Sequence, residues 1–465
     1  MKVELKDDIF KIIAQIVTDN KLEAYVIGGY VRDLLLGRAS KDIDIVVIGS
    51  GIDLAEKVAT KLGHNIGVNV FKNFGTAMLN FEGIDIEFVG ARKESYNRNS
   101  RKPMVENGSL HDDQNRRDFT INALAISLHL SNFGELLDPF DGLKALENKR
   151  IETPLNPDIT YSDDPLRMFR AIRFATKLNF TIEEKSFEAI RRNKERVEIL
   201  SKERIADELF KIIAVEKPSR GFYLLDEAGL LEIILPELTN LKGFEVISGI
   251  SYKDNFIHTL QVLDNISLNT NDIWLRWAAV FHDIGKPASK RFVNNAWTFH
   301  SHDFIGEKML PIIFERLKFP LHDKLRLVKK LVRLHLRPIV LAEKQVTDSA
   351  VRRLLFDAGN DIDDLMMLAE ADITSKNYEK ISKYLSNFKI VRQKLKEIEE
   401  KDAIRNFQPP IDGQEIIETF DLKPSKQVGM IKDAIKEAIL DGIISNSKTA
   451  AREYMMLKAK ELGII

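Results

Sequence analysis

The chain has 465 residues, of which 44% are hydrophobic and 30% charged, and 69 basic residues against 70 acidic ones leave a net charge of −1. At about 100–200 residues per domain, this length predicts two to four domains. The absence of cysteine excludes disulfides, thiolate catalysis and cysteine-bound metal centres, which leaves histidine and carboxylates as metal ligands. The near-neutral charge excludes a uniformly basic nucleic-acid coat, so a phosphate-bearing partner must meet local basic patches.

The first 20 residues mix charged and apolar side chains and show no apolar leader with a cleavage site of small residues. No stretch reaches about 18 consecutive apolar residues, the length that a membrane-spanning helix needs. We therefore expect a cytoplasmic protein that does not use a membrane.

Short apolar runs at residues 25–27, 43–48 and 84–89 alternate with glycine turns and helical stretches. This alternation predicts a mixed α/β domain over the first 150 residues.

From about residue 160 the strand pattern disappears and apolar residues recur at i, i+3, i+4 and i+7. The spacing predicts only helices there, for example over residues 166–178, 187–199 and 204–214. The predicted fold class is α+β, with a mixed α/β head on a small sheet followed by all-helical domains. The expected boundaries are 1–150 for the head, 151–245 for a helical neck, 246–375 for a histidine-rich domain and 376–465 for a helical tail.

The clearest local pattern begins where a short strand ends at Gly28 and Gly29 and a helix opens at once. Backbone N–H groups at such a turn approach a phosphate closely, and the helix N-terminus adds partial positive charge. Arg32, in the first turn, is placed to bind phosphate with both arms of its guanidinium. Gly37 is expected to end this helix in the left-handed conformation.

Asp42 and Asp44 follow two residues apart on the next strand, so both carboxylates project from one face. Oxygen ligands at that spacing can hold Mg²⁺ ions that bridge a triphosphate and activate an attacking hydroxyl. A later strand carries Asp85 and Glu87, one of which could complete a two-metal site. The structural alternative is that Asp44 pairs with Lys41 or Arg38.

These motifs resemble the class II tRNA nucleotidyltransferase and poly(A) polymerase family, which carries Gly-Gly-x-Val-Arg-Asp-x-Leu-Leu-Gly followed by Asp-x-Asp. The resemblance continues through the Arg-Arg-Asp-Phe-Thr motif at residues 116–120, the Asp-Pro-Phe-Asp-Gly motif at 138–142, the Asp-Asp-Pro-Leu-Arg motif at 163–167 and the Glu-Arg motif at 203–204. Several long motifs in the family's order over some 200 residues make the match specific.

The resemblance implies Asp42, Asp44 and Glu87 as catalytic residues, with the two aspartates as Mg²⁺ ligands. Arg117 and Asp118 would contact the ribose, and Asp164 with Arg167, expected on one face of a helix, would act as a protein template for the bases of CTP and ATP. The complete implied nucleotide-binding set is Gly28, Gly29, Arg32, Arg117, Asp118, Asp164, Arg167, Arg170 and Arg173.

Six of the nine histidines lie between His258 and His335, and one of them opens the sequence His282-Asp283-Ile-Gly-Lys286. A histidine, an adjacent His-Asp pair and a distant aspartate supply nitrogen and oxygen ligands for a divalent ion. The pattern resembles the HD phosphohydrolase superfamily and implies a metal site made by His258, His282, Asp283 and Asp372, with Asp348 and Asp361 as alternatives to Asp372. His302 and His335 could bind a second ion, and Lys286 could meet a phosphate.

Two windows carry a local excess of positive charge. Residues 167–220 hold 14 basic and 9 acidic residues, and residues 286–337 hold 12 basic and 4 acidic ones. Such surfaces are suited to RNA phosphates, although helices also carry an excess of this kind for solubility alone.

Some bacterial tRNA nucleotidyltransferases resemble this chain in carrying an HD domain behind the transferase. The resemblance implies an enzyme that adds C, C and A to the 3′ end of tRNA from CTP and ATP without a nucleic-acid template, releasing pyrophosphate. Its implied cofactors are Mg²⁺ in the head and a divalent transition metal of unknown identity in the HD domain, which would add a phosphohydrolase side activity.

The alternatives within the same chemistry are a CC-only enzyme, an A-only enzyme and a poly(A) polymerase. More distant alternatives are an HD nucleotide phosphohydrolase with a non-catalytic RNA-binding head, an HD fold without a physiological substrate, and an RNA chaperone. No obligate protein partner is implied.

Overall fold

The computed structural model describes residues 1–63, 66–97, 100–243, 246–247, 250–251, 254–294, 296–343, 347–374, 377–402, 404–405 and 407–465. The chain divides into two compact units. Unit 1 comprises residues 1–215 and 220–234, and unit 2 comprises residues 216–219 and 235–465. The expected domain boundaries at 245 and at 375–376 fall on residues outside the described ones, so they stay predictions.

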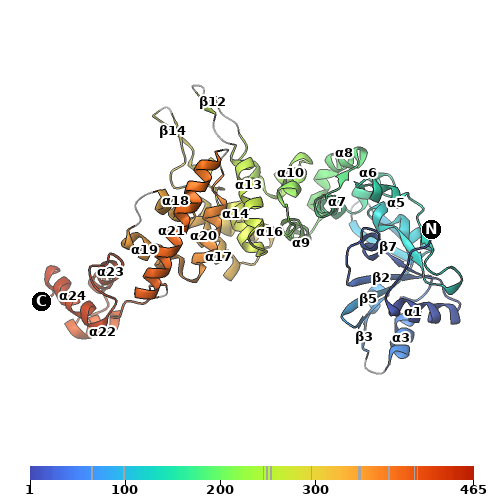
Figure 1. Ribbon diagram of the computed structural model, residues 1–465, viewed down its shortest axis with the longest axis horizontal. Helices are drawn as coiled ribbons and strands as arrows, with labels where there is room; N and C mark the ends of the chain where they lie inside the picture. The colour runs from blue at the N-terminus through green and yellow to red at the C-terminus, as the bar shows by residue number, and fades with distance from the viewer. Residues whose placement is uncertain are drawn as a thin grey trace. The chain divides into compact units, whose positions relative to one another are not determined.

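Unit 1 begins with the predicted mixed α/β fold, which contains a seven-stranded sheet in the order β3-β4-β5-β2-β1-β8-β9 (Figure 1). All neighbouring strands are antiparallel except β2 and β5, which pair in parallel. The sheet strands are β1 (Ala24–Ile27), β2 (Asp42–Val47), β3 (Val68–Phe71), β4 (Thr76–Phe81), β5 (Ile84–Gly90), β8 (Ala125–Ser127) and β9 (Leu136–Leu137).

Helix α3 (Gly51–Leu62) packs on β2, β4 and β5, and α1 (Asp8–Asp19) packs on α3. Val46 faces away from these helices, in a small cluster with Ile27, Ala91 and Ala125. Because side chains alternate along a strand, Asp42 and Asp44 share the face of Val46. The sheet therefore keeps one face for its packing helices and presents the two aspartates on the other.

The remaining elements of unit 1 are mostly helical, in agreement with the predicted α+β class. They are α2 (Gly29–Leu35), β6 (Arg92–Asn97), β7 (Ser100–Asn107), α4 (Leu110–Asn115), α5 (Gly142–Glu147), β10 (Arg150–Ile151), α6 (Pro157–Asp163), α7 (Leu166–Leu178), β11 (Thr181–Ile182), α8 (Glu184–Asn193), α9 (Lys202–Ile213), α10 (Ser219–Glu227), whose first residue belongs to unit 2, and α11 (Leu230–Ile234). Gly37 has a φ of +67°, as expected for the residue that ends α2.

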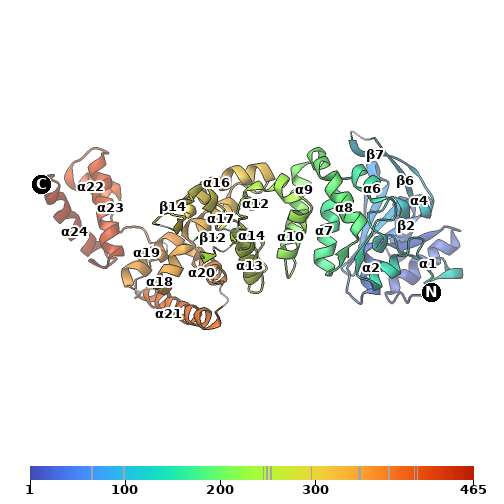
Figure 2. The ribbon, with the colours of Figure 1, turned by 90° about the horizontal axis from the view of Figure 1, so that it is seen from above.

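The described residues of unit 2 are helical apart from two short strand pairs and connecting loops. Figure 2 shows α22, α23 and α24 grouped together near the C-terminus. Its helices are α12 (Pro236–Thr239), α13 (Asn255–Ser267), α14 (Ile273–Phe281), α15 (Lys286–Ser289), α16 (His302–Leu317), α17 (Asp323–Leu334), α18 (Leu336–Glu343), α19 (Asp348–Ala358), α20 (Ile362–Ala371), α21 (Tyr378–Asp402), α22 (Gly413–Phe420), α23 (Lys426–Leu440) and α24 (Lys448–Glu461). None of the helices in the described residues is long and apolar enough to cross a membrane.

The prediction of helices alone beyond residue 160 was wrong in three places. Strands β10 and β11 pair in parallel, β12 (Val246–Ile247) pairs with β13 (Ile250–Ser251), and β14 (Arg291–Val293) forms a hairpin with β15 (Ala296–Thr298). These strands have two or three residues each, too few for a two-residue period to be recognised in the sequence. The helix expected over residues 187–199 also ends at Asn193 and continues as a 3₁₀ helix, Lys194–Ile199.

Gly51 offers a test of the packing of α3 on the sheet. A Cβ atom at this position would lie 2.7 Å from the backbone oxygen of Phe88 on β5. We expect Gly51→Ala to lower the free energy of unfolding of unit 1 by about 1–3 kcal/mol, measured by urea denaturation. The control is Gly67→Ala, because a Cβ at Gly67 meets nothing within 4 Å. Equal stabilities of the two variants would contradict the close packing.

Candidate functional site

Unit 1 contains an open cleft of about 700 Å³ where four segments distant in sequence meet. These segments are the β1–α2 turn, the start of β2, the stretch that follows α4 and the start of α7. The cleft is lined by all nine residues of the implied nucleotide-binding set and by Asp42 and Asp44.

The β1–α2 turn requires a glycine at position 28. Gly28 has a φ of +84°, in the left-handed region that residues with a side chain rarely adopt. A Cβ there would lie 2.9 Å from Arg117 Nη1 and 3.2 Å from Asp44 Oδ2. The missing side chain therefore lets the turn approach one guanidinium and one carboxylate of the cleft.

The parallel pairing of β2 with β5 sets Asp44 beside Glu87 and Asp42 beside Asp85. Burial raises the pKa of Asp44 and Asp42 adds to the rise, while Arg117 opposes it. Burial also raises the pKa of Glu87, and the Asp44 charge adds to that rise. The cation that acts on Asp44 is Arg117. Among the described residues no ion pair joins Asp44 to Lys41 or Arg38, in contrast to the structural alternative.

Glu87 does not line the cleft, in contrast to the two aspartates. In the described part of the chain, three or more possible metal-ligand atoms come close together only in unit 2. The carboxylates of Asp42, Asp44 and Glu87 in the head do not form such a group. Glu87 thus lies beside Asp44 on the neighbouring strand, outside the lining of the cleft.

Arg32 is buried and contacts protein groups with all three guanidinium nitrogens. Its Nε and Nη2 donate to Asp33 at 2.9 and 2.8 Å, and its Nη1 donates to Asn122 Oδ1 at 2.7 Å. Asn122 in turn donates to Asp118 Oδ1 at 3.0 Å. Asn122 therefore links Arg32 of the first motif to Asp118 of the Arg-Arg-Asp motif. The sequence analysis did not single out Asn122.

Two arginines of α7 that line the cleft are paired with carboxylates. Arg170 Nε lies 2.6 Å from Asp118 Oδ2, and Arg173 Nε lies 2.8 Å from the buried Glu208 Oε2. Burial alone would raise the pKa of Asp118, but Arg170 and the hydrogen bond from Asn122 hold it below its usual value. Asp118 is therefore a carboxylate held ionised and in position by its neighbours.

Phe174 is a second cleft residue that the sequence analysis did not single out. Its ring centroid lies 5.0 Å from the guanidinium carbon of Arg32, 5.5 Å from that of Arg170 and 4.3 Å from that of Arg173. A ring face attracts cations, so Phe174 helps to hold three guanidinium groups together despite their mutual repulsion.

The prediction that Asp164 and Arg167 share one helix was wrong. Helix α6 ends at Asp163 and α7 begins at Leu166, with Asp164 in an extended conformation between them (φ −130°, ψ 97°). Pro165 explains the break, since a residue before proline is disfavoured in the helical region. Both side chains still line the cleft, where Asp164 accepts from Leu166 N at 3.2 Å and Arg167 donates to Arg116 O at 2.5 Å.

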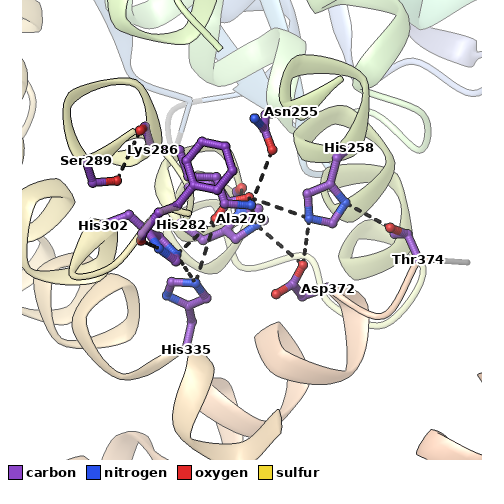
Figure 3. Close-up of polar contacts among 12 residues, drawn as sticks. Asn255, His258, Ala279, His282, Lys286, Ser289, His302, His335, Asp372 and Thr374 are labelled. Carbon is purple, nitrogen blue, oxygen red and sulfur yellow. Dashed lines mark hydrogen bonds and ion pairs between the residues drawn. The ribbon is translucent and has the colours of Figure 1, made fainter. Parts of the chain in front are cut away.

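Unit 2 brings the predicted histidines and aspartates together as two ligand groups, drawn in Figure 3. In the first group, Asp372 Oδ1 lies 2.8 Å from His258 Nε2 and 3.5 Å from His282 Nε2. Asp348 and Asp361 lie elsewhere, in ion pairs with Lys394 and Lys330. The structure therefore selects Asp372 from the three candidates.

The second group consists of Asp283, His302 and His335, with the two histidine Nε2 atoms 3.3 Å apart. Asp283 Oδ1 lies 3.3 Å from His302 Nε2, while Asp283 Oδ2 lies 3.3 Å from His282 Nε2 and 3.6 Å from His258 Nε2. The sequence analysis placed Asp283 with the first ion only. In the structure Oδ2 of Asp283 faces the first group and Oδ1 faces the second, so this one carboxylate lies between the two groups.

The histidine orientations suit metal ligation through Nε2. The Nδ1 atoms of His282, His302 and His335 each lie 2.7–2.8 Å from the backbone oxygen three residues earlier, which directs Nε2 toward the site. Within the described residues, His282 Nε2 is buried without a well-aligned hydrogen bond, and Asp283 Oδ2 is buried with ion-pair contacts only, including those to Lys286 and His282. A divalent cation would satisfy both atoms, so the side chains present fit a metal centre.

The carboxylates make this centre attractive to cations: although burial opposes it, Asp283 and Asp372 raise the pKa of His282 to about 10, and a metal ion would replace the proton of that ring. Burial lowers the pKa of His335 to about 4, which keeps this ring neutral and able to bind a metal. Although burial opposes it, His282 and Lys286 hold the pKa of Asp283 well below its usual range. Lys286 Nζ lies 2.5 Å from Asp283 Oδ2 and 3.3 Å from Asn255 Oδ1, at the edge of the ligand groups.

Three family models match the chain in order. They are the Poly A polymerase head domain at residues 24–152, the "Probable RNA and SrmB- binding site of polymerase A" at residues 179–242, and the HD domain at residues 255–377.

An A-adding tRNA nucleotidyltransferase of Aquifex aeolicus is 47% identical over 161 residues, which span 35% of this chain and 19% of that relative. An A-adding tRNA nucleotidyltransferase of Deinococcus radiodurans is 31% identical over 76% of this chain and 80% of its own length. A CCA-adding enzyme of Limosilactobacillus reuteri is 28% identical over 99% of this chain and 100% of its own length. The chain belongs to the tRNA nucleotidyltransferase family.

Solved structures agree with this fold. A tRNA nucleotidyltransferase complexed with a primer tRNA and an incoming ATP analog superimposes with a TM-score of 0.58 and 25% identity, covering 82% of this chain and 99% of its own. The Thermotoga maritima CCA-adding enzyme complexed with tRNA superimposes with a TM-score of 0.61 and 20% identity, covering 98% and 96%.

The shared position of Asp283 predicts a difference between two variants in unit 2. His302→Asn removes a ligand from one group only, so the purified chain should lose one bound Mn²⁺ per molecule. Asp283→Asn should lower the affinity of both sites about 10–100-fold or more. The measurement is Mn²⁺ binding by titration calorimetry, with circular dichroism to verify folding. His300→Asn is the matched control, since His300 is exposed and outside both groups. Unchanged binding by Asp283→Asn would contradict the geometry.

Proposed function

We propose that the chain is a nucleotidyltransferase that adds C, C and A to the 3′ end of tRNA from CTP and ATP, releasing pyrophosphate. The observation that carries this proposal is the cleft of unit 1, which joins a glycine turn, two aspartates on one strand face and several guanidinium groups. Family membership and the near full-length match to a CCA-adding enzyme support it.

In this proposal the glycine turn and the adjoining guanidinium groups bind the triphosphate. Asp42 and Asp44 would hold Mg²⁺, and this ion, when bound, would supply a lower pKa for the tRNA 3′-hydroxyl and positive charge for the leaving pyrophosphate. Glu87 supports Asp44 from the neighbouring strand. Hard divalent cations suit these oxygen ligands, and the burial of Asp44 beside other carboxylates favours a cation there.

Recognition of the nucleotide is assigned to the rest of the cleft. Arg117 and Asp118 contact the ribose, with Asp118 held by Arg170 and Asn122. Asp164 and Arg167 offer an acceptor and donors to the base, which suits the exocyclic amine and ring nitrogen shared by cytosine and adenine. Arg170 and Arg173 add positive charge near the bound phosphate groups.

The metal centre of unit 2 supports a second activity, the hydrolysis of a phosphate ester. Its ligand groups fit divalent ions, and Lys286 lies where it can contact a phosphate oxygen. A metal supplies an activated water there. The identity of the ion is assigned only as a divalent transition metal, from the mixture of imidazole and carboxylate ligands.

A second candidate is addition of adenosine alone. It is favoured by the names of the Aquifex aeolicus and Deinococcus radiodurans relatives, both A-adding enzymes. The two candidates share the same catalytic carboxylates and differ in which nucleotides the cleft accepts.

The first test addresses the carboxylates. Asp44→Asn should reduce incorporation of nucleotides into tRNA lacking its terminal triplet by about 10³-fold, equivalent to several kcal/mol of lost metal stabilisation. Incorporation of radiolabelled CTP and ATP measures this. Asp53→Asn, an exposed carboxylate on α3, is the control and should act like the wild type. Wild-type rates in Asp44→Asn would refute the proposed site.

The second test separates the two candidates. A CCA-adding enzyme extends tRNA lacking the triplet with CTP alone by two nucleotides and completes it when ATP is added. An A-adding enzyme leaves that substrate unchanged with CTP and extends only tRNA that already ends in CC. Gel resolution of the products at single-nucleotide level measures the difference. Extension by CTP alone would exclude the A-only candidate.

A further inference from the structure

A recess of about 570 Å³ in unit 2 is lined by basic side chains from helices α17 and α18. Its lining includes two carboxylates, Glu307 and Asp357. We call its five cationic residues the α17 basic patch: Arg326, Lys329, Lys330, Arg333 and Arg337. The recess lies within the window of residues 286–337, where 12 basic residues stand against 4 acidic ones.

Helix geometry directs these cations to one side. Residues 326, 329, 330 and 333 follow the i, i+3, i+4, i+7 spacing of a single helix face and extend about 10 Å along α17. The opposite face of α17 is buried through Val328, Leu331 and Val332. Because that face is packed in the core, the charged face of α17 is held outward as a row.

Several patch residues form ion pairs with neighbouring helices. Lys329 Nζ lies 3.4 Å from Glu307 Oε1 on α16, and Arg333 pairs with Asp303 and Glu307 on the same helix. Lys330 pairs with Asp361, and Arg337 pairs with Asp357 on α19. Partly exposed pairs of this kind contribute little to stability, so the cations can exchange these carboxylates for another anion.

We propose that the α17 basic patch binds the phosphate backbone of the RNA substrate. This inference rests on the proposed function, which makes that RNA a tRNA, and it adds a contact outside residues 179–242, the part that matches the RNA-binding family model. A row of cations suits successive phosphates better than a single small anion. Arginine forks at both ends of the row suit bidentate contacts with phosphate oxygens. The cations surround a recess, and the flat surface of a bilayer would not fill it, so the geometry favours RNA over a membrane as the partner.

The test uses the full-length chain and a fluorescent tRNA lacking its terminal triplet, with binding followed by anisotropy from about 50 to 200 mM salt. In K329Q/R333Q the affinity should fall about tenfold, and the slope of log K against log salt should fall by about two. K57Q/K61Q removes two exposed charges from α3, and this control should bind like the wild type.

Glu307→Gln distinguishes RNA binding from a purely structural role. This variant removes two of the three ion pairs between α16 and α17 that K329Q/R333Q removes, and it keeps both cations and the Arg333–Asp303 pair. Binding by Glu307→Gln should therefore equal or exceed that of the wild type. Equal losses in Glu307→Gln and K329Q/R333Q, or wild-type binding in K329Q/R333Q, would overturn the inference.

Two further measurements distinguish RNA binding from membrane binding and test the patch apart from the proposed function. If the wild type binds vesicles containing phosphatidylserine and K329Q/R333Q does not, while both bind RNA equally, the patch is a membrane contact and the inference is overturned.

Incorporation of CTP and ATP by the wild type at saturating tRNA tests the proposed function separately. A wild type that incorporates nothing refutes that function, whereas loss of tRNA binding in K329Q/R333Q would still identify the patch as an RNA contact.

Discussion

In both units a buried carboxylate stays ionised because cationic groups surround it, and the arrangement of each site follows from that need. Asp118 is 6% exposed and contacts Arg170, and Asp283 is 2% exposed and contacts Lys286 and the histidines. An unpaired charge in a protein interior is costly, so these contacts also dictate where the neighbouring side chains lie. In unit 1 the constraint extends through Asn122 to Arg32, which connects the two long motifs of the head.

The two sites balance their charges differently. In the cleft of unit 1 the guanidinium groups of Arg32, Arg170 and Arg173 gather around Phe174, and each of them is paired with a carboxylate that holds it in place. In unit 2 the ligand atoms of the histidines and aspartates face one another, with both oxygens of Asp283 directed at histidine Nε2 atoms. The first arrangement suits a triphosphate, and the second suits metal ions.

Much of the local structure was predictable from the sequence. The period of apolar residues predicted β1, β2 and β5, and it predicted α7 with the bounds that the structure has. Gly37 was expected to end α2 and has the left-handed conformation. These features depend on residues close together in the chain, where spacing and the preferences of glycine decide the outcome. The short strands beyond residue 160 were missed because two or three residues carry no recognisable period.

The sequence by itself determined which chemical groups are available: two aspartates at a spacing of two, a glycine turn, an arginine-rich helix and a histidine-aspartate set without cysteine. Only the tertiary structure decided how they meet. It gave Asn122 its bridging position, gathered three guanidinium groups on Phe174, and turned the two oxygens of Asp283 toward different ligand groups. The physical reason is that these contacts join segments far apart in the chain, so they depend on the packing of whole elements rather than on local spacing.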